Sequence, residues 1–327
     1  MLRVHLGAWP TPVQRADRLG SALGGAGELW IKRDDLSGFS WGGNKVRAVE
    51  YLLADAQAGG ATDIVLAGGP SSNFAALMAA GARVVGLGVH QISYGSEPDH
   101  DVAALVAGRT MGSQVLFTGS DDRSTMESFA AKYGAELEDG GAHPYVVPRG
   151  GASTIGALGF YAAGEEIEAQ STDGQPTTIV LPLGSGGSTA GLVAALCSSQ
   201  RPWRVHAISV SRDPSSMMEV ISDTAVRCAA LHGVSLQPAH VAERLVIHDG
   251  RDPGFGRVSP EQRERMAEIT SATGLLVDPT YNAKALAWLS TARNDFGLGD
   301  VPLLYWHTGG ALGAIDHARF LERTQTT

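Results

Sequence analysis

The chain has 327 residues, 43% of them hydrophobic, and a formal net charge of −9 at pH 7. The acidic balance argues against nucleic acid and anionic membranes as partners, and the apolar content is that of a globular protein with a core. Two cysteines, Cys197 and Cys228, are too few for a disulfide framework and indicate a reducing compartment or no use of disulfides.

Residues 1–14 lack a basic segment followed by an apolar run, and no run of 18 apolar residues occurs. We therefore expect no signal peptide, no membrane span and a cytoplasmic protein.

Short β-branched runs alternate with helical patterns along the chain. Strands are expected at residues 28–34, 62–67, 83–89, 114–117, 145–147, 177–183, 205–210 and 301–306. Helices are expected at 45–57, 73–81, 101–111, 125–136, 153–170, 188–198, 215–231, 260–273, 282–296 and from 311. This alternation predicts parallel sheets built from βαβ units, in which ligands bind beyond the carboxyl ends of strands. No linker is evident, so a second domain would be an insertion.

The turn between the first of these strands and the first helix holds Gly42, Gly43, Asn44 and Lys45. The glycines permit positive φ and the close approach of a flat ligand, and Asn44 suits a helix N-cap. Lys45 then falls on the first helical turn, where the helix dipole lowers the pKa of an amine. A partly neutral lysine can act as a nucleophile and form a Schiff base. On these four residues alone, a solvated lysine after a turn is the simpler interpretation.

The turn at residues 68–73 offers two hydroxyls and an amide at a helix start, from Ser71, Ser72 and Asn73. A serine N-cap accounts for this pattern equally well.

Five small residues follow the strand at 177–183, and they are Gly184, Ser185, Gly186, Gly187 and Ser188. Their backbone N–H groups, at the start of a helix, predict a cradle for a phosphate. The segment lacks the Lys-Ser/Thr pair of a P-loop, and Thr189 stands where a dinucleotide motif needs glycine, so a phosphate monoester fits better.

Two late turns add further hydroxyls. Thr308 follows the strand at 301–306, and we interpret its neighbour His307 as a packing or hydrogen-bonding residue. Tyr281 is a phenol near a helix start, where the dipole favours its ionised form. Asp34 and Asp35 are interpreted as structural. Motifs of zinc proteases, paired-cysteine sites and α/β-hydrolases are missing from the sequence, and we expect no metal site.

Six motifs, in this order, resemble those of the 1-aminocyclopropane-1-carboxylate deaminase/D-cysteine desulfhydrase family of pyridoxal 5'-phosphate enzymes. They span residues 32–47, 68–73, 144–151, 184–188, 278–281 and 307–310, so the resemblance covers nearly the whole chain. It implies fold type II, which is the tryptophan synthase β-like α/β fold with two open parallel-sheet domains. A large cofactor-binding domain of residues 1–47 and 157–327, a smaller inserted domain of residues 48–156 and a homodimer are the expected organisation.

The resemblance also implies roles for individual residues. Lys45 matches the lysine that forms a Schiff base with the cofactor, Asn73 the asparagine that bonds its 3'-oxygen, and Thr308 a residue near its pyridine nitrogen. The phosphate loop corresponds to Gly184, Ser185, Gly186, Gly187 and Ser188. Ser72 matches the serine that contacts the substrate carboxylate or moves protons, and Tyr281 the tyrosine that assists at the reacting carbon.

Four positions on the substrate side depart from the family pattern. Ser71 stands where glutamine is common, Phe74 where histidine is, Phe255 where tyrosine is, and Asn282 where the deaminases have glutamate. Ser71, Ser72, Phe255 and Asn282 are the expected substrate-binding residues. Since each change removes a polar group while the cofactor positions are kept, we expect cyclopropane opening to be slow.

The expected activity is that of a pyridoxal phosphate-dependent lyase or deaminase acting on a small amino acid. It would remove the α-proton and eliminate the β-substituent, yielding a 2-oxo acid and ammonia in the manner of D-cysteine desulfhydrase. Three alternatives remain open: a β-replacement synthase or racemase in specialised amino-acid metabolism, a 1-aminocyclopropane-1-carboxylate deaminase, and a binding protein without catalysis.

Overall fold

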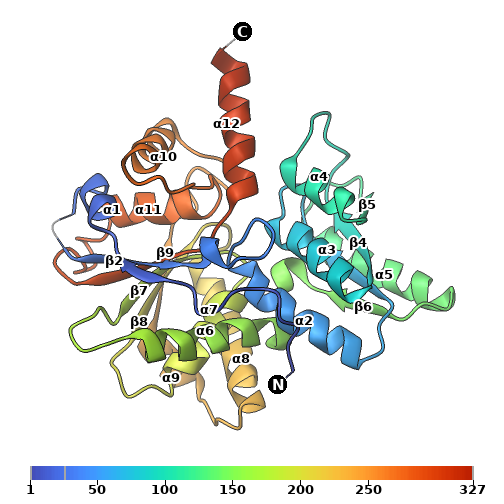
Figure 1. Cartoon of the computed structure of the whole chain (residues 1–327), viewed down its shortest axis with the longest axis horizontal. Coiled ribbons are helices and arrows are strands. Elements are labelled where there is room, and N and C mark those ends of the chain that lie inside the picture. The colour runs from blue at the N-terminus through green and yellow to red at the C-terminus, as the bar shows by residue number, and fades with distance from the viewer. Residues whose placement is uncertain (1, 26, 326–327) are drawn as a thin grey trace.

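The computed structural model describes residues 2–25 and 27–325, which form two α/β units built on separate sheets (Figure 1). The larger sheet has six strands in the order β1-β2-β10-β7-β8-β9. Of the strand pairs within the described residues of this sheet, only β1 and β2 run antiparallel. The strands are β1 (Val13–Arg15), β2 (Leu29–Arg33), β7 (Thr178–Leu183), β8 (Arg204–Ser209), β9 (Leu245–Asp249) and β10 (Leu303–His307). Every residue of β7 is buried, as expected for a parallel strand covered on both faces.

Helices cover both faces of the larger sheet. On one face α6 (Thr154–Gln170), α7 (Gly187–Leu196) and α8 (Pro214–Leu231) pack around Trp306. On the other face α1 (Asp17–Ala22), α10 (Pro260–Thr273) and α11 (Asn282–Thr291) surround Tyr305. These two aromatic residues are neighbours on β10 and therefore point to opposite faces. The short α9 (Pro238–Arg244) leads into β9.

The smaller sheet has four parallel strands in the order β5-β4-β3-β6. They are β3 (Asp63–Ala67), β4 (Gly88–Ser93), β5 (Gln114–Phe117) and β6 (Pro144–Val147). The helices of this unit are α2 (Lys45–Ala58), α3 (Asn73–Val85), α4 (Ala103–Thr110) and α5 (Thr125–Asp139). The four strands fall inside the segment 48–156 that the sequence suggests as an inserted domain, and the limits of that domain stay a prediction.

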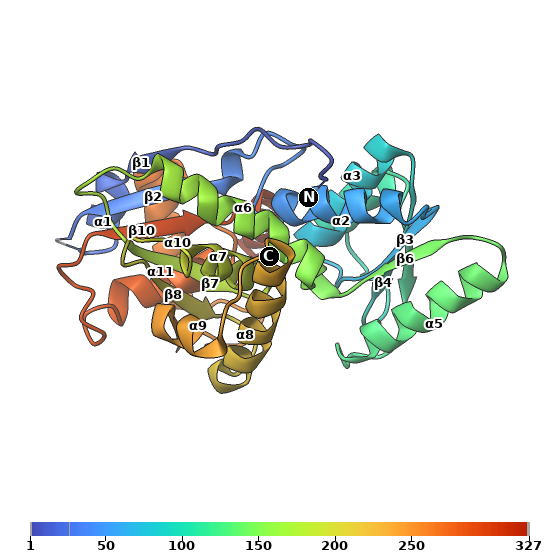
Figure 2. The same cartoon turned by 90° about the horizontal axis from the view of Figure 1, so that it is seen from below.

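The two units meet along α2 and α6, which lie side by side between the sheets (Figure 2). A second connection comes from α12 (Ala311–Gln325), which projects from the larger unit in Figure 1. There the carboxylate of Asp316 accepts the backbone N–H of Ala103 at the start of α4, at 2.9 and 3.1 Å. Within the described residues, no helix is long and apolar enough to cross a membrane.

A buried charged cluster fixes the start of α2 against β2 and α6. Arg47 donates to Asp34 at 2.8 and 2.9 Å and to Glu166 at 3.0 Å, while Lys32 also pairs with Glu166. Burial alone would raise the pKa of Asp34, but Arg47 outweighs it and the pKa is lowered. The structural interpretation of Asp34 is confirmed. Glu166 on α6 belongs to this cluster.

Several element boundaries differ from those expected. The strand expected at 83–89 is wrong up to residue 87, because α3 continues to Val85 and ends at Gly86, whose φ is +78°, and β4 begins only at Gly88. The helix expected at 282–296 ends at Thr291. The short elements β1, α1, α9 and β9 were not expected from the sequence.

Candidate active site

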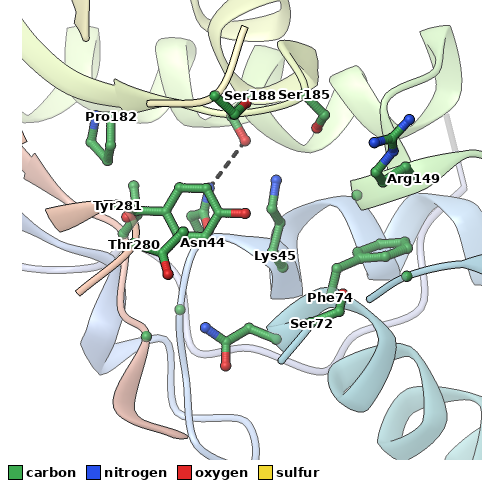
Figure 3. A pocket seen from close by; sticks show the side chains of 18 of the residues that line it. Asn44, Lys45, Ser72, Phe74, Arg149, Pro182, Ser185, Ser188, Thr280 and Tyr281 are labelled. Atoms are coloured by element: carbon green, nitrogen blue, oxygen red, sulfur yellow. Dashed lines mark hydrogen bonds between the residues drawn. The ribbon is translucent and has the colours of Figure 1, made fainter. Parts of the chain in front are cut away.

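Turns from both units converge on a cavity of about 260 Å³ between the two sheets (Figure 3). Most site residues expected from the sequence line it, and they are Lys45, Ser71, Ser72, Asn73, Gly184, Ser185, Gly186, Ser188, Phe255, Tyr281 and Thr308. Gly187 and Asn282 belong to the expected set but do not line the cavity.

Lys45 begins α2 and its amine points into the cavity, toward the loop that carries Ser185 (Figure 3). Positive φ angles of +69° and +112° at Gly42 and Gly43 make the preceding turn. A Cβ on Gly43 would lie 3.1 Å from the carbonyl oxygen of Thr308, so a side chain there would crowd the end of β10. The Gly-Gly pair thus lets the lysine loop pack directly against β10.

The Asn44 side chain does not cap α2, contrary to expectation. Its Nδ2 instead donates to the hydroxyl of Ser188 at 3.1 Å, the hydrogen bond drawn in Figure 3. Asn44 therefore ties the lysine loop to the loop at 184–188, two segments far apart in the sequence.

Burial lowers the pKa of the Lys45 amine to about 8. The sequence suggested the same direction but a different cause, the dipole of α2. A pKa of about 8 leaves roughly 10% of the amine neutral at pH 7, several hundred times more than a solvated lysine. Lys45 can therefore act as a nucleophile or accept a proton under ordinary conditions.

The loop before α7 has the geometry of an anion cradle. Gly186 takes the left-handed conformation at φ +100° and is the N-cap of α7. The N–H groups of the first turn of a helix have no partner inside that helix, and they favour a negative charge. Ser185 and Ser188 add two hydroxyls beside them. Gly187 plays another role, because its Cβ would lie 3.1 Å from Cα of Ala152, so glycine is needed there for packing.

A second helix start faces the same cavity. Ser72 is the N-cap of α3, and its hydroxyl oxygen accepts the N–H of Ala75 at 3.2 Å. The adjacent Asn73 has a buried Oδ1 without a hydrogen-bond partner among the described residues. An unsatisfied buried amide at the edge of a cavity indicates that a ligand completes its hydrogen bonding.

The Asn282 side chain does not line the cavity and instead hydrogen-bonds to neighbouring residues in the protein interior. Its Nδ2 donates to Asp278 at 2.7 Å and to the carbonyl of Gly309 at 2.8 Å, and its Oδ1 accepts the hydroxyl of Tyr305 at 2.8 Å. The amide of Asn282 is fully buried, and its hydrogen bonds fix the turn at Thr308. The expectation that Asn282 contacts the substrate is therefore wrong.

The Tyr281 phenol also differs from expectation. Burial raises its pKa to about 12, so it stays protonated where the sequence suggested an ionised form. His307 is confirmed as a hydrogen-bonding residue: its Nε2 lies 3.2 Å from the carbonyl of Leu276, and its Nδ1 accepts the N–H of Gly309 at 3.2 Å.

Three lining arginines were missed in the sequence, and they are Arg123, Arg149 and Arg212. Each follows a strand by a few residues, at the sheet edge where ligands bind in this class of fold. That position is the signal that could have identified them.

The cavity fits the cofactor that the sequence suggests. It is lined by an amine of lowered pKa, a helix start suited to a phosphate and an amide that lacks a partner among the described residues. Within the part of the chain that the structure describes, no group of three His, Cys, Asp or Glu side chains is arranged to hold a metal ion.

Comparison with known proteins agrees with this geometry. A family model described as "Pyridoxal-phosphate dependent enzyme" matches residues 4–309. The bifunctional D-cysteine desulfhydrase/1-aminocyclopropane-1-carboxylate deaminase, mitochondrial, of Arabidopsis thaliana is 32% identical, covering 94% of this chain and 78% of its own. The D-cysteine desulfhydrase of Klebsiella pneumoniae is 31% identical, covering 94% of both chains. A crystal structure of an ACC deaminase homologue superposes with a TM-score of 0.89 at 30% identity, over 99% of this chain and 96% of that one.

Proposed function

The chain belongs to the pyridoxal-phosphate dependent enzyme family, and we propose that it is a lyase of small amino acids. It would remove the α-proton, expel a β-substituent and release a 2-oxo acid and ammonia. The observation that carries this proposal is the convergence of Lys45, the 184–188 loop and the start of α3 on one cavity. The activities in the names of the relatives, D-cysteine desulfhydrase and 1-aminocyclopropane-1-carboxylate deaminase, support it.

Four parts of the cavity wall would hold the cofactor. Lys45 would hold it through its amine, Asn73 would bond its 3'-oxygen, and the loop of Gly184, Ser185, Gly186, Gly187 and Ser188 would cradle its phosphate. The Thr308 hydroxyl lines the cavity, accepts Nδ2 of Asn282 at 3.2 Å and lies 3.5 Å from Oδ1 of the same amide, and it would stand near the ring nitrogen. When bound, pyridoxal phosphate supplies an electron sink for negative charge at the substrate α-carbon.

The side chains around that position supply binding and proton transfer. The start of α3, with the Ser72 hydroxyl and the neighbouring Ser71, suits the substrate carboxylate, since helix N-termini favour anions. The Lys45 amine, with a pKa of about 8, can accept the α-proton near neutral pH. The Tyr281 phenol is protonated and can donate to the departing group.

The overall reaction balances without an oxidant or a second substrate. The α-proton moves to Nζ of Lys45, the electron pair of the C–H bond forms a double bond between the α- and β-carbons, and the leaving group departs with its bonding pair. One water then hydrolyses the released enamine, through its imine form, to a 2-oxo acid and ammonia.

The test is a product assay with the purified protein loaded with pyridoxal phosphate. D- and L-amino acids with β-leaving groups are supplied, and 2-oxo acid and ammonia are measured. We expect equal amounts of both from at least one enantiomer and none from Lys45→Ala. A new amino acid without ammonia would indicate β-replacement, and exchange of the α-hydrogen alone would indicate racemisation; either result would overturn the proposal.

We further propose that the protein works as a homodimer in the cytoplasm, with residues 48–156 as the inserted domain. The two cysteines are unbridged, which is compatible with a reducing compartment. Light scattering after size exclusion, cell fractionation and limited proteolysis near residues 48 and 156 test the three statements separately.

A further inference from the structure

The cavity has an unbalanced charge. Its lining carries four cationic side chains, Lys45, Arg123, Arg149 and Arg212, against a single carboxylate among the described residues, Asp278. That carboxylate is already occupied, because it accepts the backbone N–H groups of the following turn at 2.8 to 3.0 Å. The cationic charge of the cavity is therefore left without a free anion on the described part of its wall.

Among these four cations, Arg123 has surroundings that differ most from those of a solvated arginine. Its guanidinium lies 3.9 Å from the ring centroid of Phe255 and 5.7 Å from that of Tyr94. Its Nε is buried and lacks a hydrogen-bond partner among the described residues. Burial lowers the pKa of Arg123, and the nearby charges of Arg149 and Arg212 lower it further. An anion bound beside the guanidinium would give Nε an acceptor and would offset the cost of burying this charge near two other arginines.

The Phe255 ring that contacts Arg123 is held in place by the larger unit. Lys284 is buried and donates through Nζ to the carbonyls of Arg251 and Gly254, in the loop that presents Phe255. Gly254 has φ +128°, a conformation that side chains disfavour. An unsubstituted phenyl face supports a guanidinium by cation–π attraction, so phenylalanine at position 255 serves this contact without a hydroxyl.

The position of Arg123 matches the leaving-group side of the site. The substrate carboxylate and the cofactor phosphate each have a helix start of their own, at α3 and α7. Arg123 instead contacts Phe255, and the Phe255 ring meets the ring of Tyr281, the proposed proton donor, edge to face with 6.1 Å between the centroids. Arg149 is less available than Arg123, since it pairs with Glu127 at 2.8 Å.

We propose that Arg123 is a specificity-determining residue that binds a second anionic group, a carboxylate, phosphate or sulfonate, on the β-substituent of the substrate. Arg212 adds positive charge to the same subsite. This inference rests on the proposed lyase function and names the substrate class of that same site.

The experiment compares matched substrates in the loaded wild-type enzyme and in Arg123→Gln. The anionic substrates are O-phosphoserine, S-sulfocysteine and S-carboxymethylcysteine as separate enantiomers, and β-chloroalanine is the neutral one. We expect kcat/KM of Arg123→Gln to fall about 10- to 100-fold for the preferred anionic substrate, the range for losing a charged hydrogen bond. For β-chloroalanine the fall should be less than about threefold. Arg123→Lys keeps the charge without the planar fork and should retain part of the preference.

Two further measurements separate this inference from the proposed function. Binding of 2-amino-3-phosphonopropionate, which has no leaving group, should weaken about 10- to 100-fold in Arg123→Gln, while binding of alanine changes less than about threefold. Arg227→Gln is the control for net charge, because that arginine is exposed on α8, and it should behave as wild type.

Equal losses for anionic and neutral ligands would overturn the inference, as would a wild-type enzyme that processes β-chloroalanine but no anionic substrate. Loss of bound cofactor in Arg123→Gln would also overturn it, by placing the arginine at the cofactor phosphate. If no amino acid yields a 2-oxo acid, the lyase proposal fails, and the phosphonate titration still decides whether Arg123 binds an anion.

Discussion

Replacing Lys45 by methionine removes an amine whose charged form the cavity disfavours, so we expect the cofactor-free protein to become more stable at pH 7. Burial lowers the pKa of this amine from 10.5 to about 8. The native state therefore binds fewer protons than the unfolded chain between pH 8 and pH 10.5. In that window the stability of the wild type rises with pH, and below it the full penalty for a buried ammonium is present.

The size of the effect follows from the two pKa values. Their difference of about 2.5 corresponds to a penalty of about 3 kcal/mol at pH 7, at 1.36 kcal/mol per pKa unit. At pH 9.5 most of the native amine is neutral, and the same arithmetic leaves about 1 kcal/mol. These figures are upper limits, because water in the open cavity reduces the penalty.

The assay is urea unfolding of the apoprotein at pH 7 and pH 9.5. We expect Lys45→Met to gain up to about 3 kcal/mol at the lower pH and up to about 1 kcal/mol at the higher. Lys132→Met is the control, since that lysine is 77% exposed on α5, and it should change stability by less than about 0.5 kcal/mol at both pH values. A loss of stability in Lys45→Met at pH 7, or a gain that does not depend on pH, would refute the reasoning.

Four other outcomes are expected. Borohydride reduction of the loaded enzyme followed by peptide mapping should label Lys45; a label on Lys284, whose amine is occupied by two carbonyl groups, would contradict this. Gly186→Asp should lower cofactor occupancy after dialysis by about tenfold or more, because it adds a carboxylate and a side chain at φ +100° where the phosphate is expected; unchanged occupancy argues against that placement. Arg47→Met should destabilise the protein by about 3–5 kcal/mol in urea unfolding, since it leaves the buried carboxylate of Asp34 without its cationic partner, and a neutral effect would show that the cluster is dispensable. Phe255→Tyr should raise the rate of 2-oxo acid release from 1-aminocyclopropane-1-carboxylate, which is expected to be low in the wild type, and fast ring opening by the wild type speaks against our account of position 255.

Much of the fold was accessible from the sequence because apolar runs and helical patterns alternate between turn residues along the chain. The helix at 260–273 was expected with the bounds that α10 has, and the strand at 114–117 with those of β5. The turns of the site were also accessible, since glycine pairs beside polar residues at strand ends are typical of ligand-binding turns in parallel sheets. Lys45 was identified in this way, as the first residue of α2.

What the sequence could not supply are contacts between distant segments. Asn282 looked like a substrate-side residue because it stands where the deaminases have glutamate, but tertiary contacts with Tyr305 and Gly309 turn its side chain away from the cavity. Arg123 belongs to no recognised motif, and its role emerges only where the loop of Phe255 meets it from the other unit. The direction in which a side chain points, and its partners in the other unit, are set by tertiary packing, which the local sequence pattern does not encode.

The strand order of the larger sheet has a consequence for synthesis on the ribosome. β10 lies between β2 and β7 but is the last strand to be made, whereas all four strands of the smaller sheet are complete once Val147 has emerged. From Val147 to His307 the chain lengthens by 160 residues, which takes roughly 10 to 30 s at about 5–20 residues per second. During that interval we expect β2 and β7 to lack their shared partner and to need protection by chaperones. Nascent chains stalled before β10 should resist protease only between about residues 48 and 156, and resistance of the flanking segments would show that the larger sheet assembles in another way.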